Sequence, residues 1–360
     1  MNARILAINP GSTSTKAAVF EDGRLAAETS IEHSALELAS FRGVMGQLSW
    51  RMRALCEAMD LSGRFDAVVG RGGFLAPVPG GVYAVGTAML DELSRAAHGE
   101  HASNLGAFMA MEVARENGCP ALVVDPVATD ELMDAARMTG LPEISRRSIF
   151  HALGQRGAAR EAARRLGIDY GHGRFIVAFL GGGISVGAHL KGRVVDVTNA
   201  LDGEGPFSPE RSGALPLLPV LDLLERGVHS PAELRSIVTS RAGLSAHLGC
   251  GDLRRCEEFM AAGDGKAARV FEALAYNVAK AVASMAPALE GRVEAVVYAG
   301  GMARSTRLTH ELTKLTAFLG PVVVVTGLEE LEAMARGAML ALEGKLPVQK
   351  YPPPGPGENG

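Results

Sequence analysis

Short apolar runs alternate with longer amphipathic segments along the chain, a pattern that indicates a mixed α/β protein. The apolar and alternating runs predict strands at 15–20, 25–27, 67–69, 121–124, 184–190, 194–197, 293–298 and 322–325. Helical periodicity predicts helices at 41–59, 87–97, 103–116, 145–166, 216–226, 231–239, 266–289 and 328–342. The proline-rich end, 346–360, is expected to be a flexible tail.

One pattern occurs twice. Residues 4–16 and 174–186 are each an apolar strand that runs into a turn of small residues and then into a second, alternating strand. A polar reversal ending in Gly-Arg and a third apolar run follow in both places. This spacing is far wider than the roughly 20 to 50 residues of a solenoid repeat. It therefore predicts two duplicated domains, each with a β-hairpin whose tip offers backbone N–H groups to phosphate.

The length of 360 residues agrees with two domains. We expect one domain at 1–150 and a nucleotide-binding domain at 151–328, with the crossover in the helix that carries His151. The helix at 329–345 is expected to return to the first domain.

Composition excludes several classes of protein. The 36 basic and 40 acidic residues leave a net charge of -4, which argues against a nucleic-acid partner. No apolar run approaches the ~20 residues of a membrane helix, and the first residues do not resemble a signal peptide. The four cysteines lack metal-binding spacing, which favours structural thiols in a reducing cytoplasm.

Three glycine turns follow predicted strands, at Gly11, at Gly181, Gly182 and Gly183, and at Gly300 and Gly301. None has the spacing of a Walker A loop. The turn at 181–183 leads into a strand rather than a helix, so a dinucleotide-binding fingerprint fits poorly. Each turn alone is best explained as a tight hairpin. Together, with two of them in matching units, they indicate an ATP cleft.

Five motifs carry a closer resemblance: NPGSTSTK at 9–16, GRGG at 70–73, HASN at 101–104, SIFH at 148–151 and ALDGEGPFSPERSG at 200–213. With these motifs the chain resembles the acetate and butyrate kinase family, within the superfamily of actin, sugar kinases and Hsp70. The resemblance covers about residues 9–342. It implies two duplicated ribonuclease H-like domains of the actin-like ATPase fold, with ATP bound between them. The implied reaction forms an acyl phosphate and ADP from a short-chain carboxylate and ATP, with Mg²⁺ as cofactor, in a homodimer or larger oligomer.

The resemblance also implies roles for individual residues. Arg71 and Arg211 match the arginines at the reacting centre, a place suited to a guanidinium that binds carboxylate or phosphoryl oxygens in a bidentate manner. Asp125 would orient an arginine, and His151 would stabilise the transferring phosphoryl group. Asn9 and Glu330, or Glu329 if the alignment slips, would lie near Mg²⁺. The residues implied to bind phosphate are Ser12, Ser14, Lys16, Gly181, Gly182 and Gly183. Those implied to contact adenosine are Gly300 and Gly301. Those implied to line the acid pocket are Gly72, Gly73, His101, Asn104 and Phe150.

Structural roles are the alternatives for these residues: surface ion pairs for the arginines, an Asp-Pro turn for Asp125, a structural histidine for His151, and solvated helix residues for His101 and Asn104. Phe179 stands where the family usually has a histidine, which removes one possible donor to phosphate. Gly72 and Gly73 replace the bulky residues of acetate kinases, which suggests room for butyrate or isobutyrate. The alternatives for the whole protein are an acetate or propionate kinase, and a non-catalytic ATP-binding protein of the same superfamily.

Overall fold

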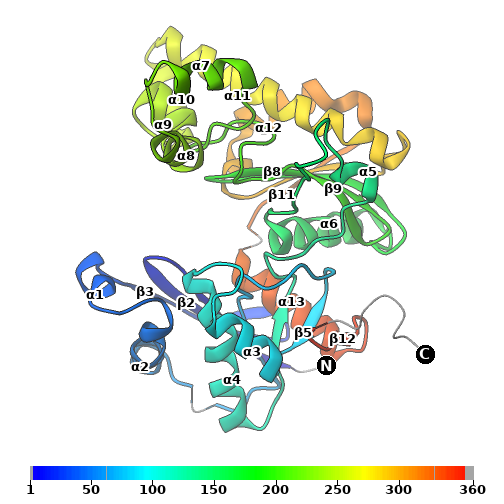
Figure 1. Ribbon diagram of the computed structural model, residues 1–360. Coiled ribbons are helices and arrows are strands. Elements are labelled where there is room, and N and C mark those ends of the chain that lie inside the picture. Colours follow the sequence, from blue (N-terminus) through cyan, green and yellow to red (C-terminus); the bar gives the residue numbers. More distant parts are fainter. Residues whose placement is uncertain (1–2, 62, 328, 353–360) are drawn as a thin grey trace. The chain divides into compact units, whose positions relative to one another are not determined.

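The computed structural model describes residues 3–61, 63–327 and 329–352, which divide into two compact units (Figure 1). Unit 1 consists of residues 1–130 and 329–360, and unit 2 consists of residues 131–328. The first segment of unit 1 therefore ends at Asp130, before the expected boundary at 150.

The sheet of unit 1 has the strand order β12-β5-β6-β4-β1-β2-β3. Its strands are β1 (Arg4–Pro10), β2 (Ser14–Glu21), β3 (Arg24–Glu32), β4 (Ala67–Gly70), β5 (Val82–Ala84), β6 (Ala121–Val124) and β12 (Val348–Gln349). The helices are α1 (Ala35–Ala39), η1 (Met45–Gln47), α2 (Leu48–Ala58), α3 (Thr87–Ser94), η2 (Ala102–Asn104), α4 (Leu105–Asn117) and α13 (Glu330–Leu342).

The sheet of unit 2 has the order β11-β10-β7-β8-β9. Its strands are β7 (Arg174–Leu180), β8 (Ile184–Leu190), β9 (Arg193–Val197), β10 (Ala295–Ala299) and β11 (Val322–Val325). The helices are α5 (Asp134–Arg137), α6 (Ala152–Leu166), α7 (Leu217–Glu225), α8 (Pro231–Ser240), α9 (Gly243–Leu248), α10 (Leu253–Ala261), α11 (Gly265–Ser284), η3 (Ala286–Leu289), η4 (Gly301–Arg304), α12 (Thr306–Thr316) and η5 (Ala317–Leu319).

The predicted duplication is confirmed by these two sheets. The run β6-β4-β1-β2-β3 of unit 1 has the same order and directions as β11-β10-β7-β8-β9 of unit 2, with parallel pairs first and two antiparallel pairs after them. The last pairing, of β2 with β3 and of β8 with β9, also shifts its register at the same place, between Val19 and Phe20 and between Ala188 and His189. Because a bulge is tied to local strand geometry, a shared bulge indicates a shared origin of the two units.

Each sheet is covered by helices on both faces. In unit 1, Leu6, Ile8 and Val68 belong to a core cluster with α4, whereas Val124 meets α13 at Gly337. Successive strand residues point to opposite faces, so α4 and α13 cover different sides. In unit 2, α11 packs with Ile176 and Ala178, and α6 packs with Phe175 and Val177.

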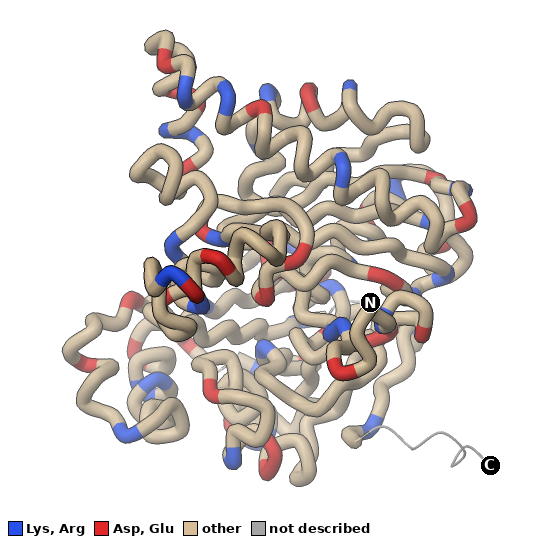
Figure 2. The backbone as a smooth tube through the Cα atoms, turned by 45° about the horizontal axis from the view of Figure 1, so that its top comes forward, with Lys and Arg blue, Asp and Glu red and all other residues tan. Residues whose placement is uncertain are grey.

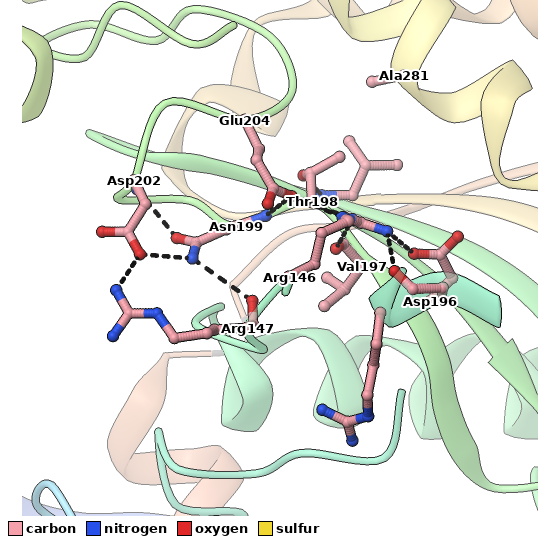
Figure 3. Close-up of polar contacts among 12 residues, drawn as sticks. Arg146, Arg147, Asp196, Val197, Thr198, Asn199, Asp202, Glu204 and Ala281 are labelled. Carbon is pink, nitrogen blue, oxygen red and sulfur yellow. Dashed lines mark hydrogen bonds and ion pairs between the residues drawn. The ribbon is translucent and has the colours of Figure 1, made fainter. Parts of the chain in front are cut away.

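The predicted helix at 145–166 is wrong in its first part, since α6 begins only at Ala152. Arg146 ties the preceding segment, which has no regular secondary structure, to β9 and to the loop after it (Figure 3). Its guanidinium donates to the carbonyls of Ala136 (2.8 Å) and Val197 (2.7 Å), to Asp196 and twice to Glu204. All five N–H donors are thus used, and this network outweighs the local helix propensity.

The predicted tail also differs. Val348 and Gln349 form β12, which pairs in parallel with β5, and the Tyr351 ring packs against the core of unit 1. The tail prediction is therefore wrong for these residues, while 353–360 lie outside the described residues. The short helices α9, α10 and α12 were not predicted.

Charge is mixed on both units. Figure 2 shows Lys and Arg interspersed with Asp and Glu along each backbone, in keeping with the near balance of basic and acidic residues. Among the described helices, none combines the length and hydropathy that crossing a bilayer requires.

Candidate active site

In unit 1, predicted site residues gather at one edge of the sheet. The parallel strands β1, β4 and β6 are neighbours, and their carboxyl ends lead to Asn9, Arg71 and Asp125. This is the edge at which open α/β sheets bind ligands. Asp125 is fully buried and has a left-handed backbone with φ of 40°, an uncommon conformation for a residue other than glycine. A structural Asp-Pro turn does not require such burial.

Glu330 joins this group from the first turn of α13. Its carboxylate accepts a hydrogen bond from Asn9 Nδ2 at 2.7 Å and lies 3.6 Å from Arg71 Nη2. Glu330, one of the two alternatives that the sequence left open, thus lies beside Asn9 and Arg71, and its choice over Glu329 as the metal-site residue stays a prediction. Arg71 Nη1 is buried and has no hydrogen-bond partner among the described residues. A buried guanidinium nitrogen in this state is suited to an anionic ligand.

The first phosphate hairpin is held by a residue that sequence reasoning missed. The side chain of Arg51, from α2, is fully buried, and its Nη1 donates to the carbonyls of Gly11 (2.9 Å) and Ser14 (3.0 Å) and to Thr15 Oγ1 (3.0 Å). Burial lowers the pKa of Arg51. The sequence does contain a signal for this role: Arg51 lies four residues before Leu55, and so on the apolar, buried face of the helix, where an arginine is unusual.

Ser12 at the hairpin tip contacts His101. The His101 Nδ1 accepts a hydrogen bond from the backbone N–H of Ser103 at 3.1 Å, so in the neutral ring the proton lies on Nε2, which is 3.2 Å from Ser12 Oγ. Burial, and then the charges of Arg71 and Arg51, lower the pKa of His101 and favour this neutral form. Ser14 and Lys16 follow on β2, where Lys16 is exposed directly opposite Asn9.

Asn104 is buried rather than solvated. It is 1% exposed, its Oδ1 accepts from the Phe74 N–H at 3.0 Å, and its Nδ2 donates to the Gly99 carbonyl at 3.0 Å. Both ends of the amide therefore brace the loop that follows Arg71.

The space beside Gly72 and Gly73, which the sequence suggested for a longer acid, is occupied by neighbouring residues of the protein. A Cβ on Gly72 would lie 2.6 Å from Val123 Cγ1, and one on Gly73 would lie 2.3 Å from Asn104 Oδ1. The argument that these glycines open space for a longer acid is wrong. They are small because the loop packs closely against β6 and η2.

In unit 2, the second glycine turn contacts Arg211. The Arg211 Nη1 donates to the Ala200 carbonyl at 2.8 Å and lies 2.0 Å from the position that a Cβ on Gly183 would take. Ser208 ties the same loop to the turn through a 2.6 Å hydrogen bond to the Gly182 carbonyl. Burial lowers the pKa of Arg211, without removing its charge at neutral pH. Gly183 is therefore small so that the guanidinium can lie against the turn.

A pocket of about 800 Å³ opens beside this turn. It is lined by Gly181 and Gly182, by Gly301, Met302, Arg304 and Ser305 in and after η4, and by residues of the α9–α10 region. Gly300 has φ of 90° and packs against the Leu180 carbonyl, and Gly301 faces open space. The volume lies in the range of small-molecule and cofactor pockets, and three of the five predicted glycines, Gly181, Gly182 and Gly301, line it.

His151 is the N-cap residue of α6. Its ring stacks on Phe179, with centroids 4.7 Å apart, and its Nδ1 lies 2.9 Å from Ser185 Oγ. Phe179 thus supports the histidine by ring stacking. The neighbouring Phe150 is 3% exposed and belongs to a hydrophobic cluster with Leu132, Ala136, Val194 and Val197. This placement assigns Phe150 to the core of unit 2.

The donor set near Asn9 fits Mg²⁺ bound together with phosphate. Asn9 and Glu330 offer hard oxygen ligands, and Mg²⁺ in nucleotide sites usually takes one or two protein carboxylates together with phosphate oxygens and water. Within the described ranges, no cluster of three or more His, Cys, Asp or Glu side chains is arranged to hold a metal ion alone.

Comparison with known proteins identifies the family. Residues 142–325 match the acetokinase family. The chain is 52% identical to a probable butyrate kinase of Oleidesulfovibrio alaskensis, over 96% of this chain and 98% of that protein. It is 47% identical to a probable butyrate kinase of Maridesulfovibrio salexigens, over 98% and 99%. The fold is similar to that of Porphyromonas gingivalis acetate kinase, with a TM-score of 0.74 and 18% identity over 94% of this chain and 100% of that one.

The fold is the actin-like ATPase fold, with two duplicated α/β units. The chain belongs to the acetokinase family. The resemblance inferred from the five motifs is thereby confirmed.

Proposed function

We propose that the protein transfers the γ-phosphoryl group of ATP to the carboxylate of a short-chain acid, with butyrate as the first candidate. The observation that carries this proposal is the buried Arg71 nitrogen without a partner among the described residues, beside Asn9 and Glu330 at the ligand-binding edge of the sheet. The names of the relatives at 52% and 47% identity support butyrate.

The chemistry needs no general base. A carboxylate is ionised at neutral pH, so its oxygen can form the new bond to phosphorus while the bond from phosphorus to the bridging oxygen of ADP breaks. The protein has to hold two anions in line and offset their charge. We assign Arg71 to the carboxylate, Asp125 to orienting an arginine as the resemblance implies, and Arg211 and His151 to the transferring phosphoryl group.

The pocket beside Gly181 is the proposed nucleotide site. Its glycines allow the backbone to approach phosphate, and Gly301 leaves open space for adenosine. The N–H groups and side chains of Ser12, Ser14 and Lys16 provide a second set of phosphate ligands. Mg²⁺, held by Asn9 and Glu330, would neutralise phosphate charge when bound. The expected ATP cleft between the two domains stays a prediction.

The choice of butyrate rests on the names of the relatives. The close packing around Gly72 and Gly73 leaves no extra space that would favour a longer acid. A series of kcat/KM values for acetate, propionate, butyrate and isobutyrate decides it. We expect the highest value with butyrate or isobutyrate. A preference for acetate or propionate would replace butyrate in the proposal.

The activity itself is tested by trapping acyl phosphate as a hydroxamate. The wild-type protein should form hydroxamate from butyrate and MgATP, and Arg211→Ala should reduce kcat by about 100- to 1,000-fold without loss of folding. The matched control is Arg241→Ala, which removes an exposed arginine of the same unit. ATP turnover without hydroxamate would indicate an ATP-driven binding protein. Mg²⁺ dependence, a cytoplasmic location, a role in short-chain fatty acid metabolism and a homo-oligomeric state belong to this proposal as well.

A further inference from the structure

A line of hydrogen-bonded side chains crosses the interior of unit 2 and ends at His151. Tyr170 OH lies 2.9 Å from His189 Nδ1, and His189 Nε2 lies 3.1 Å from Gln155 Oε1. Gln155 Nε2 lies 2.7 Å from Ser185 Oγ, which in turn lies 2.9 Å from His151 Nδ1. The three middle residues are fully buried.

Secondary structure aligns this polar chain. Gln155 follows His151 by one turn of α6, and its N–H donates to the His151 carbonyl at 2.8 Å. Ser185 and His189 lie on one face of β8, because residues four apart on a strand share a face. Gly187, between them, lets the amide enter: a Cβ there would lie 2.5 Å from Gln155 Oε1. A glycine inside a strand often marks such a close approach.

The amide of Gln155 gives the chain a direction. Its Nε2 can only donate, so Ser185 Oγ accepts from it. The hydroxyl proton of Ser185 is then directed to His151 Nδ1, which accepts. At the other end, Oε1 can only accept, so His189 carries a proton on Nε2, and its Nδ1 accepts from Tyr170 OH.

One protonation state of His151 fits this direction. A proton on Nδ1 would meet the hydroxyl proton of Ser185 in a buried place, where an unsatisfied donor is costly. The neutral ring therefore carries its proton on Nε2, away from Ser185. Stacking on Phe179, with an interplanar angle of 24°, holds the plane of the same ring.

We propose that Ser185 and Gln155 are positioning residues that fix His151 as the Nε2–H tautomer, so that it donates a hydrogen bond to a phosphoryl oxygen. The hydrogen-bonding partner rests on the proposed function, whereas the tautomer does not. Ser185, Gln155, His189 and Tyr170 act through His151.

The tautomer can be measured directly by ¹⁵N–¹H correlation spectra of the histidine-labelled full chain, with the signals assigned by comparison with His151→Gln. The wild-type spectrum should show a protonated Nε2 and an unprotonated Nδ1 for His151. In Ser185→Ala, and also in Tyr170→Phe, which removes a donor four links away, the spectrum should show a mixture of tautomers. A local packing role of Tyr170 would not change the spectrum of His151.

Kinetics provide the second measurement. Ser185→Ala should lower kcat for hydroxamate formation by about 10-fold or more with both KM values nearly unchanged, since general acid or hydrogen-bond donation contributes in the transition state. Thr316→Val is the matched control for the loss of a buried hydroxyl, because it removes the 2.7 Å hydrogen bond to Tyr298 in the same unit. It should lower the melting temperature about as much as Ser185→Ala and leave kcat near that of the wild type.

The proposal is overturned if wild-type His151 carries its proton on Nδ1. It is also overturned if both variants keep the wild-type spectrum and kcat, and Tyr170→Phe decides the matter should Ser185→Ala not fold. Failure of the proposed function would look different: the wild-type protein would form no hydroxamate, while the spectra would still decide the tautomer.

Discussion

At the residue scale, the most informative pair is Gly183 and Arg211. The glycine is buried in a turn of the kind that hairpins and phosphate loops share, and its sequence context does not tell the two apart. The structure adds that Arg211 Nη1 occupies the place of the missing side chain. The glycine turn at 181–183 and the loop that carries Arg211 therefore pack directly against each other.

Gly183→Ala should reduce kcat by about 10- to 100-fold, because misplacement of a charged group by about 1 Å can cost that much. The clash is with the end of a flexible side chain, so Arg211 moves and the melting temperature changes little. Hydroxamate formation and thermal unfolding are the measurements. Gly140→Ala, with no atom within 4 Å of its Cβ position, is the control. Unchanged kcat in Gly183→Ala would show that the exact place of Arg211 is unimportant.

The sequence motifs name candidate site residues, but they do not name the residues that hold those candidates in place. Asn9, Arg71 and Glu330 come together as the family resemblance implied, and the sequence could not separate Glu330 from Glu329. Arg51 and Arg146 were missed because their partners are mainly backbone carbonyls or residues distant in sequence. Backbone carbonyls leave no trace in composition or periodicity.

At the scale of elements, the first hairpin depends on α2. Arg51 satisfies carbonyls on both sides of the tip, and His33, at the end of β3, lies 2.8 Å from Thr15 Oγ1 through its Nε2. The tip is therefore fixed from inside the unit before any ligand binds. Such fixed donors are what an anion site requires.

Arg51→Met should keep the apolar volume but leave buried acceptors unsatisfied, with a loss of about 2 to 4 kcal/mol in the free energy of unfolding. Urea unfolding measures this loss, and the KM for ATP should rise because the hairpin is less ordered. Arg53→Met, an exposed position of the same helix, should change either quantity little. Equal stability of the two variants would contradict the bracing role.

The same hairpin should make stability depend on pH. The pKa values of His33 and His101 are both lowered from 6.5, first by burial and then by the charge of Arg51 for His33 and of Arg71 for His101. Below about pH 6.5 the unfolded chain binds protons that the folded chain resists, so stability falls as pH falls through that value. The sign is the reverse of that for a histidine stabilised by a carboxylate.

Melting temperatures between pH 7.5 and 5.5 test this dependence. The double variant His33→Gln, His101→Gln should lose less stability over this range than the wild type. His310→Gln, an exposed histidine of unit 2, should follow the wild type. Parallel curves for all three proteins would exclude the two buried histidines as the source.

At the scale of the whole molecule, the duplication could be predicted from the sequence. It is recorded in the alternation of apolar and polar positions, which is kept even where the individual residues differ between the two copies. The boundary between the two units, after Asp130, could not be predicted from the sequence. The segment 131–151 has no regular strand or long helix, and its contacts with β9 are formed by residues such as Arg146 and Met133, far from β9 in sequence.

Unit 1 is completed by the end of the chain. Met334 and Ala338 of α13 are fully buried, and Gly337 lies so close to the sheet that its Cβ would be 2.4 Å from Val124 Cγ1. A chain that ends at Gly327 should therefore expose an apolar face of the sheet and aggregate or lose the native circular dichroism of unit 1. A chain that ends at Pro352 retains every described contact and is the control. A soluble, fully folded chain ending at Gly327 would contradict this account.

This arrangement has a consequence for synthesis on the ribosome. Residues 131–328 are all made after the strands β1 to β6 and before α13. At a synthesis rate of about 5 to 20 residues per second, roughly 10 to 40 seconds pass between the synthesis of β6 and that of α13, the helix that covers one face of the sheet of unit 1. Unit 2, which is continuous, can finish folding first, so the later unit in the sequence is the earlier one in time. During that interval the uncovered strands are the part of the nascent chain that most needs protection from aggregation.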